Sequence, residues 1–315
     1  MNNVIFGSGL VGLLAKALLP GWKVVPFARS RFFSFNPALD DNFIVQDERI
    51  DEAIRDIRQV TTPGVTHRYR RCFDVRGHLH GTYDKGLCVE WLSKIFSGAT
   101  PGQSEPFYRT QMDLRVYDVR CNQLYAELLQ RFMPEMMEEH RKGKVTSFGD
   151  HYFVRNGIRE EFDHAICTIP LNATQEFLGA PSSLPTKDLH YMHVQTDTLN
   201  FEGFNQVLST DPTLPFYKVT NVAPDRYLFY CHQEIPQPGP LLMLFIKNFE
   251  ILDGTSVPLA LPTGPAIHLD GLESKGYYCV GSNAQWDWCM DISSCILRLV
   301  RYTQRGFKPF QRVSL

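Results

Sequence analysis

The chain opens with a short apolar run, Val4 to Phe6, that enters three glycines at positions 7, 9 and 12. Residues 13–19 continue with apolar positions at helical spacing and stop at Pro20 and Gly21. A second apolar run follows at 23–27. This order predicts a strand, a glycine turn, a helix and a second strand, which is the first unit of an open parallel sheet.

The remaining pattern predicts elements of both kinds. Helical spacing of apolar residues predicts helices at 48–59, 87–96, 122–141 and 292–302. Alternation and turn residues predict short strands within 66–83 and between 145 and 162, with a turn at Asn156-Gly157. Buried strands are predicted at 163–170 and 276–281, and an antiparallel sheet at 190–246.

These elements predict an α/β protein with a discontinuous Rossmann-like nucleotide-binding domain, an inserted helical region and a mostly antiparallel sheet in a substrate domain. Residues 1–45, 142–180 and 268–315 form the predicted nucleotide-binding domain. Residues 46–141 form the mixed strand and helix insertion, and residues 181–267 form the sheet that covers the substrate.

Composition narrows the functional classes. At 315 residues and 43% hydrophobic residues, the chain can bury a large core. Its net charge of -2 differs from the basic field of proteins that track nucleic-acid phosphates. The eight cysteines form no C-x-x-C pair and the histidines are scattered, so no metal site is expected. With neither a signal peptide nor a membrane span in the pattern, the expected location is the cytoplasm.

The glycine turn has a defined chemical role. The first glycine permits a tight turn, the second lets the backbone approach a pyrophosphate, and the third allows the helix to pack closely on the strand. The N-terminus of the helix offers unpaired N–H groups to the anion. The predicted cofactor-binding residues of this turn are Gly7, Ser8, Gly9, Leu10, Val11 and Gly12.

The end of the second predicted strand lacks the acidic residue that commonly binds the adenosine ribose. Phe27, Ala28, Arg29 and Ser30 stand there instead. Two explanations stay open: Arg29 and Ser30 bind the 2′-phosphate of NADP, or an FAD ribose is held by Arg29 and backbone groups. A solvent-facing Arg29 without any ligand fits the pattern equally well.

The C-terminal segment and one central strand carry a resemblance to known proteins. Gly281, Ala284, Trp286, Trp288, Met290 and Asp291 resemble the second FAD signature of the flavin amine oxidase and UDP-galactopyranose mutase superfamily. Ser282 stands where arginine is common in that signature. Residues 163–170 are similar to the strand that re-enters the FAD domain, and Val145 is placed like the residue near the adenine. The resemblance implies FAD, bound by Phe27, Ala28, Arg29, Val145, Thr168, Pro170, Gly281, Ser282, Trp286, Met290 and Asp291 in addition to the glycine turn.

Residues 211–221 and 226–232 resemble the aromatic sheet that covers the flavin in this superfamily. Aromatic walls exclude water from the site of hydride removal. The candidate substrate residues are Tyr217, Lys218, Arg226 and Tyr230, and the catalytic candidates are Lys218, Tyr230 and His232. Alternating aromatic residues in strands fit plain core packing as well.

The resemblance implies an FAD-dependent oxidoreductase that oxidises a carbon-nitrogen bond of an amine or amino acid, with molecular oxygen as electron acceptor. Two alternatives stay open: a non-redox enzyme similar to UDP-galactopyranose mutase, and an NADP-binding protein. The start of the chain and its C-terminal segment also resemble small bacteriophage flavoproteins that modify thymidine in DNA. That narrower resemblance implies glycine attached to thymine as substrate, modified DNA as partner and the host cytoplasm as location.

Overall fold

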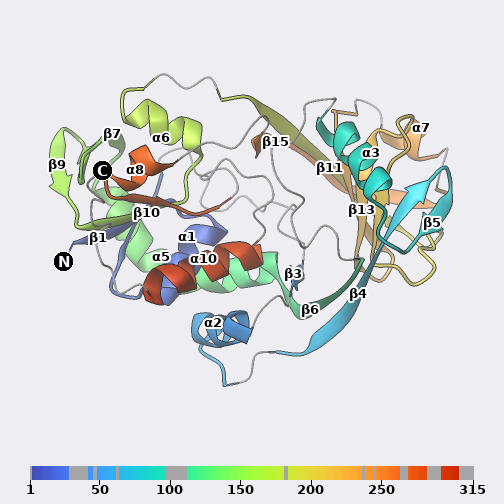
Figure 1. Ribbon diagram of the computed structural model, residues 1–315, viewed down its shortest axis with the longest axis horizontal. Coiled ribbons are helices and arrows are strands. Elements are labelled where there is room, and N and C mark those ends of the chain that lie inside the picture. The colour runs from blue at the N-terminus through green and yellow to red at the C-terminus, as the bar shows by residue number, and fades with distance from the viewer. Residues whose placement is uncertain are drawn as a thin grey trace.

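The computed structural model describes residues 2–27, 42–44, 48–61, 64–96, 112–180, 184–235, 238–243, 246–262, 269–281 and 292–304. Two halves lie side by side (Figure 1), one built on a parallel sheet and the other on a larger, mostly antiparallel sheet. The predicted α/β class with a Rossmann-like sheet is therefore confirmed.

The parallel sheet has four strands in the order β16-β10-β1-β2. They are β1 (Asn3–Phe6), β2 (Lys23–Val25), β10 (His164–Cys167) and β16 (Tyr277–Cys279). All three pairings are parallel, and the side chains of Val4, Ile5 and Phe6 are fully buried. Such continuous apolar strands are expected where both faces of a parallel sheet are covered. The two segments predicted as buried strands, 163–170 and 276–281, therefore both lie in this sheet.

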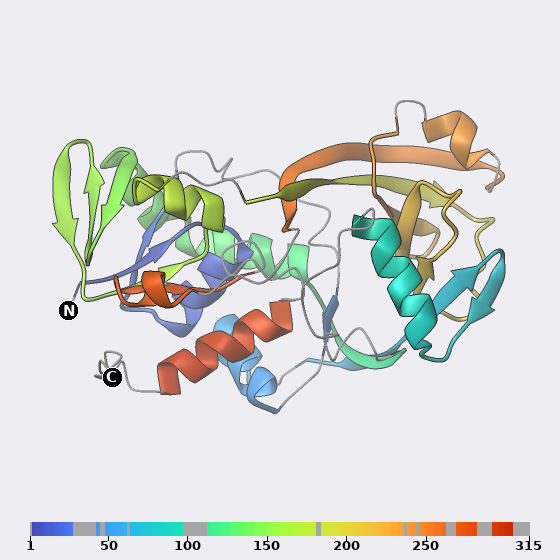
Figure 2. The same ribbon diagram turned by 45° about the horizontal axis from the view of Figure 1, so that its top comes forward.

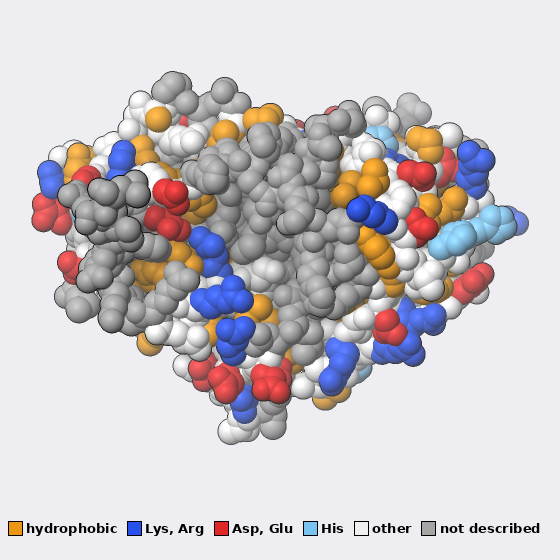
Figure 3. All heavy atoms as spheres, viewed as in Figure 1, with side chains coloured by type: hydrophobic (Ala, Val, Ile, Leu, Met, Phe, Trp, Pro, Cys, Tyr) orange, Lys and Arg blue, Asp and Glu red, His pale blue; other side chains and the backbone are white. Residues whose placement is uncertain are grey.

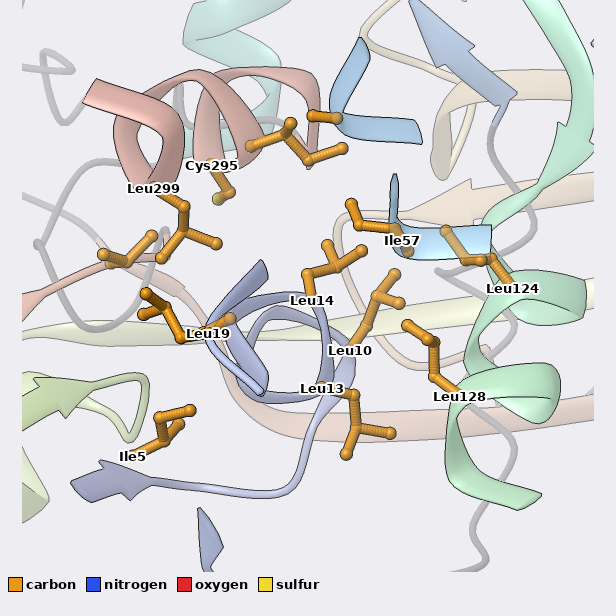
Figure 4. Packing of buried hydrophobic residues seen from close by; sticks show 14 of the residues in the cluster. Ile5, Leu10, Leu13, Leu14, Leu19, Ile57, Leu124, Leu128, Cys295 and Leu299 are labelled. Carbon is orange, nitrogen blue, oxygen red and sulfur yellow. The ribbon is translucent and has the colours of Figure 1, made fainter. Parts of the chain in front are cut away.

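Four helices pack in one core beside this sheet. They are α1 (Leu10–Leu18), α2 (Glu48–Arg58), α5 (Cys121–Arg141) and α10 (Ile292–Gln304). Figure 4 shows Leu10, Leu13 and Leu14 of α1 surrounded by residues of the other three helices, including Ile57 and Leu128. Helices α2 and α5, which lie within 46–141, therefore share a core with α1. The predicted domain boundaries remain a prediction.

A three-stranded antiparallel sheet and two short helices cover the other side of the parallel sheet. The strands are β7 (Val145–Gly149), β8 (Tyr152–Arg155) and β9 (Ile158–Glu161), and the helices are α6 (Leu171–Phe177) and α8 (Asp270–Glu273). The turn predicted at Asn156 and Gly157 joins β8 to β9, with φ of 51° and 77°. The rings of Phe148 and Phe153 pack 4.7 and 5.2 Å from the ring of Phe6.

The larger sheet has nine strands, and Figure 2 shows it as a twisted wall opposite the parallel sheet. Its strands are β3 (Asn42–Ile44), β4 (Thr66–Val75), β5 (His78–His80), β6 (Asp113–Arg120), β11 (Thr186–Thr196), β12 (Gln206–Ser209), β13 (Phe216–Ala223), β14 (Arg226–Cys231) and β15 (Phe249–Pro262). Their order is β15-β11-β14-β13-β12-β4-β6-β3, with β5 beside β4. Within this sheet, β12 and β4 are the only described strands that pair in parallel, and the other pairs are antiparallel. The predicted mostly antiparallel second sheet is confirmed.

A helix packs against part of each face of the larger sheet. Helix α3 (Lys85–Phe96) packs its Trp91 and Ile95 against one face, with Tyr191, Tyr217 and Tyr230 in the same cluster. Helix α7 (Pro238–Leu242) packs its Leu242 into the cluster on the opposite face. The residues of β14 alternate between these two clusters, as the side chains of a strand must.

Two classes of feature are missing from the part of the chain that the structure describes. No helix there is long and apolar enough to cross a membrane. No group of three or more His, Cys, Asp or Glu side chains there is arranged to hold a metal ion.

The half built on the parallel sheet also buries an ionic network. Arg155 on β8 is only 2% exposed, and its guanidinium donates to both carboxylate oxygens of Glu160 at 2.7 and 2.8 Å. It also donates to the buried carboxylate of Glu139 on α5 at 3.0 Å. Burial alone would raise the pKa of Glu139, but hydrogen bonds from Lys142 and Arg155 outweigh it and lower that pKa. The network therefore ties α5 to the three-stranded sheet.

Candidate functional site

The glycine turn lies where β1 ends and α1 begins. Gly7 has a φ of +111°, a conformation that favours glycine, and a Cβ there would overlap Oγ1 of Thr168. A Cβ on Gly12 would lie 2.9 Å from the carbonyl carbon of Gly7 and closer still to its oxygen. Both positions therefore require glycine because the turn, the helix and β10 approach one another so closely.

Gly9 differs from the other two glycines of the turn. It is the N-cap of α1, with φ of −71° and ψ of 178°, and a Cβ added there would meet no heavy atom within 4 Å. Within the described part of the chain, no side chain caps the helix, and its first turn carries no acidic residue. The described residues thus leave space beside Gly9 at the N–H groups of the first turn, which is the arrangement that an incoming pyrophosphate needs.

The carboxyl ends of two further strands converge on this turn. Thr168, which follows β10, donates from its backbone N–H and from its hydroxyl to the carbonyl of Phe6, at 2.9 Å each. Gly281, which follows β16, has a φ of +118°, and a Cβ there would lie 3.9 Å from Val11. Pro170 is the N-cap of α6. In open parallel sheets, ligands bind at this edge, beyond the carboxyl ends of the strands.

The position after β2 is occupied by an aromatic ring. The Phe27 ring lies 4.9 Å from that of Phe177, and both pack against the cluster that buries Val145. Among the described residues, the place of the ribose-binding acid is therefore taken by an apolar contact. The other predicted cofactor residues, Ala28, Arg29, Ser282, Trp286, Met290 and Asp291, lie outside the described residues.

A bulge in β13 brings three of the predicted substrate residues together. The pairing between β13 and β14 shifts between Phe216 and Lys218, and Lys218 lies opposite Tyr230. The Lys218 ammonium lies 3.6 Å from the centre of the Tyr230 ring. Tyr217 and Tyr230 are buried under α3, where the Trp91 indole donates to the Tyr217 carbonyl at 2.7 Å.

The other two predicted residues of this region lie at opposite ends of β14. Arg226 begins the strand, pairs with Gln195 and is exposed. His232 directly follows the strand, and its backbone N–H donates to the Pro215 carbonyl at 3.1 Å. Six residues of extended chain separate them by about 20 Å. The structure thus groups Tyr217, Lys218, Tyr230 and His232 in one part of the sheet and leaves Arg226 apart from them.

Two lysines near His232 were not predicted. Lys94 on α3 donates to the Ser209 hydroxyl at 3.2 Å and to the carbonyls of Asp211 and Phe216 at 2.5 and 2.7 Å. Burial lowers the pKa of Lys94 to about 8, although Asp211 and Asp74 oppose this shift. Lys187 on β11 donates to the Ile95 carbonyl at 2.8 Å. The sequence could have indicated Lys94, because it stands three residues after Trp91 and therefore on the buried face of the same helix.

Comparison with known proteins finds matches among solved structures. No protein-family model and no curated protein sequence matches the chain. A reduced UDP-galactopyranose mutase superposes with a TM-score of 0.64 at 12% identity, over 98% of this chain and 94% of that one. The chain has the UDP-galactopyranose mutase fold. An oxidoreductase from Methanosarcina mazei shares it, with a TM-score of 0.56 at 12% identity over 96% of this chain and 100% of that one.

A flavin-dependent halogenase from Xanthomonas campestris is a further structure with this fold. It superposes with a TM-score of 0.56 at 13% identity, over 98% of this chain and 71% of the halogenase. The predicted likeness to the mutase and FAD-dependent oxidoreductase fold is therefore confirmed at the level of the fold. The narrower resemblance to bacteriophage enzymes stays a prediction.

Proposed function

We propose that the chain binds FAD, with the pyrophosphate on the N-terminus of α1. The geometry of Gly7, Gly9 and Gly12 carries this proposal, because two of these glycines close the turn and the third leaves space beside helix N–H groups that no described side chain caps. Thr168, Val11 and Gly281 lie beside the same turn. The flavoprotein fold favours FAD over NADP as the dinucleotide.

We further propose that the protein is an oxidoreductase that oxidises a carbon-nitrogen bond of an amine or amino acid, with molecular oxygen as acceptor. Bound FAD would supply the acceptor for a hydride. The chain's own contribution is to orient the substrate and exclude water, and the aromatic cluster of Tyr191, Tyr217 and Tyr230 has the apolar character that this requires. Lys218, held over the Tyr230 ring, supplies a positive charge at the same place.

Substitution of Gly9 tests the cofactor site. Gly9→Asp keeps the backbone conformation that an N-cap needs and places a carboxylate where the pyrophosphate would lie. We expect this variant to fold with unchanged or higher thermal stability without cofactor and to lose FAD affinity by at least about 100-fold, because two anions would share one site. The measurement is flavin absorbance of the purified protein, followed by titration with FAD.

Gly9→Asn is the matched control, since asparagine caps helices equally well and carries no charge. We expect a smaller loss of affinity than with aspartate. Equal FAD content in wild type and Gly9→Asp would refute the proposed site.

The reaction is tested separately on flavin-loaded protein. Bleaching of the flavin absorbance by an amine or amino acid without oxygen, and hydrogen peroxide formation with oxygen, are the expected results. A flavin that no such substrate reduces would overturn the proposed oxidation and leave FAD binding intact. Turnover of a nucleotide sugar that requires prior reduction but consumes no electrons would assign mutase chemistry instead. Thymine-linked glycine, the narrower predicted substrate, is tested in the same assay.

A further inference from the structure

Three basic side chains meet at one end of the strands of the larger sheet, where α3 ends. Lys187 lies near the start of β11, His232 follows the end of β14, and Lys94 lies two residues before the end of α3. Strands β11 and β14 are antiparallel neighbours with His190 opposite Cys231, so Lys187 and His232 lie at the same end. Figure 1 shows this end facing the middle of the molecule, between the two sheets.

These side chains also lie on the same face of the sheet. Leu189, Tyr191, Leu228 and Tyr230 pack in the cluster under α3. Because alternate residues of a strand point to the same face, Lys187 lies on the face of Leu189 and Tyr191, and His232 lies on the face of Leu228 and Tyr230. The hydrogen bond from the Lys187 ammonium to the Ile95 carbonyl of α3 places Lys187 on the same face. The His232 backbone N–H donates to the Pro215 carbonyl and the Lys94 ammonium donates to the adjacent Phe216 carbonyl, so both groups lie beside the start of β13. In keeping with this, burial and then the charges of Lys94 and Lys187 lower the pKa of His232.

The imidazole of His232 has an unusual environment. Its Nδ1 is buried and has no hydrogen-bond partner within the described residues. A buried polar atom without a partner destabilises the folded protein, and such atoms occur where a ligand or water completes the structure. Lys94 already donates three hydrogen bonds, the full number its ammonium can make, so it contributes charge rather than a further contact.

We propose that His232 and Lys187 form an anion-binding subsite that receives the carboxylate of the substrate, with Lys94 adding its charge from the adjacent helix end. The inference rests on the proposed function and makes amino acids the preferred substrate class over simple amines. Asp74 and Asp211 lie beside Lys94 and offset part of the positive charge of this corner, which weighs against a doubly charged phosphate. One imidazole and one ammonium match the two oxygens of a carboxylate.

Binding is tested on the purified protein with acetate and inorganic phosphate as probes. The imidazole NMR signals of His232, assigned with His232→Leu, are followed in each titration. Acetate should shift them saturably and raise the pKa of His232, which burial and the charges of Lys94 on α3 and of Lys187 and His190 on β11 lower in the free protein. Asp211, after β12, acts on Lys94. His190→Leu is the control, because His190 lies on the opposite face and contacts Ser256. A response to phosphate alone, or to neither anion, would overturn the proposal.

Kinetics of the flavin-loaded protein give a second readout. Lys187→Met and His232→Leu should raise KM for an amino acid by roughly 10- to 100-fold more than KM for the amine without the carboxylate, the size of a lost charge-assisted hydrogen bond. His232→Asn keeps an N–H donor near Nδ1 and should recover part of this preference. Oxidation of amines without acetate binding would refute the subsite alone. Acetate binding to a protein that takes up no flavin would refute the proposed function and leave the subsite standing.

Discussion

Gly12→Ala is expected to destabilise the protein by about 3 kcal/mol or more and to abolish flavin binding, although alanine is the better helix former. Position 12 lies inside α1, where helix propensity alone would favour alanine by about 1 kcal/mol. The added methyl would overlap the carbonyl of Gly7, and a backbone group cannot rotate away as a side chain can. Relief requires α1 to move off β1, which opens the core of Leu10, Leu13 and Leu14.

Urea denaturation monitored by circular dichroism measures this loss, and flavin absorbance reports the cofactor. Gly21→Ala is the matched control, because a Cβ there meets no heavy atom within 4 Å and its φ is not positive. We expect its stability to lie within about 0.5 kcal/mol of wild type. A Gly12→Ala protein as stable as the control would contradict the close contact between the helix and the turn.

Glu139→Gln is expected to cost about 2–3 kcal/mol at pH 7, somewhat below the roughly 3–5 kcal/mol typical when one partner of a buried ion pair is removed. The cost is smaller here because Glu160 still pairs with Arg155 through two hydrogen bonds. The variant leaves the buried guanidinium with one carboxylate, and Lys142 loses its partner at 2.5 Å.

The dependence on pH follows from the lowered pKa of Glu139. The stabilisation is fully present above the ordinary pKa of 4.5, at which this group titrates in the unfolded chain, and it is lost as the pH falls through the lower pKa of the folded state. Wild type and Glu139→Gln should therefore converge in stability below pH 4.5. The exposed neighbour Glu138, changed to glutamine, is the control and should stay close to wild type throughout. A gap that persists unchanged at low pH would show that the ion pair is not its source.

On the face shown in Figure 3, lysine and arginine side chains are interspersed with acidic ones. This distribution agrees with the net charge of -2. It favours ligand recognition by a few individual charges rather than by a broad electrostatic field of one sign. The corner of Lys94, Lys187 and His232 is such a local arrangement.

The strand-turn-helix at the start of the chain could be predicted from the sequence because its parts interact over a few residues. The spacing of Gly7, Gly9 and Gly12 specifies which backbone groups approach each other before any other segment arrives. The helices α2, α5 and α10 were predicted for a similar reason, since each shows its buried face as a periodic pattern of its own.

The order of strands in the larger sheet could not be predicted from the sequence, because it depends on contacts between distant segments. Strand β6 lies between β3 and β4, and β4 pairs in parallel with β12 from a segment more than a hundred residues later. Strands β3 and β6 and helix α6 were not predicted. Strand β15 lies within the predicted sheet region 181–267 but beyond the strands predicted at 190–246. Alternation of apolar and polar residues predicts a strand but does not specify which strands pair with it, and that pairing is set only in the folded chain.

By itself the sequence determined the glycine turn, the class of fold and the aromatic character of β13 and β14. Only the tertiary structure decided that Tyr217 and Tyr230 pack under α3, because burial against protein and burial against a ligand leave the same alternating pattern. It also decided that Arg226 lies apart from His232, and that Lys94 and Lys187 join His232 from two other elements. Those side chains meet because α3 packs across β11 and β14, a contact that no local pattern records.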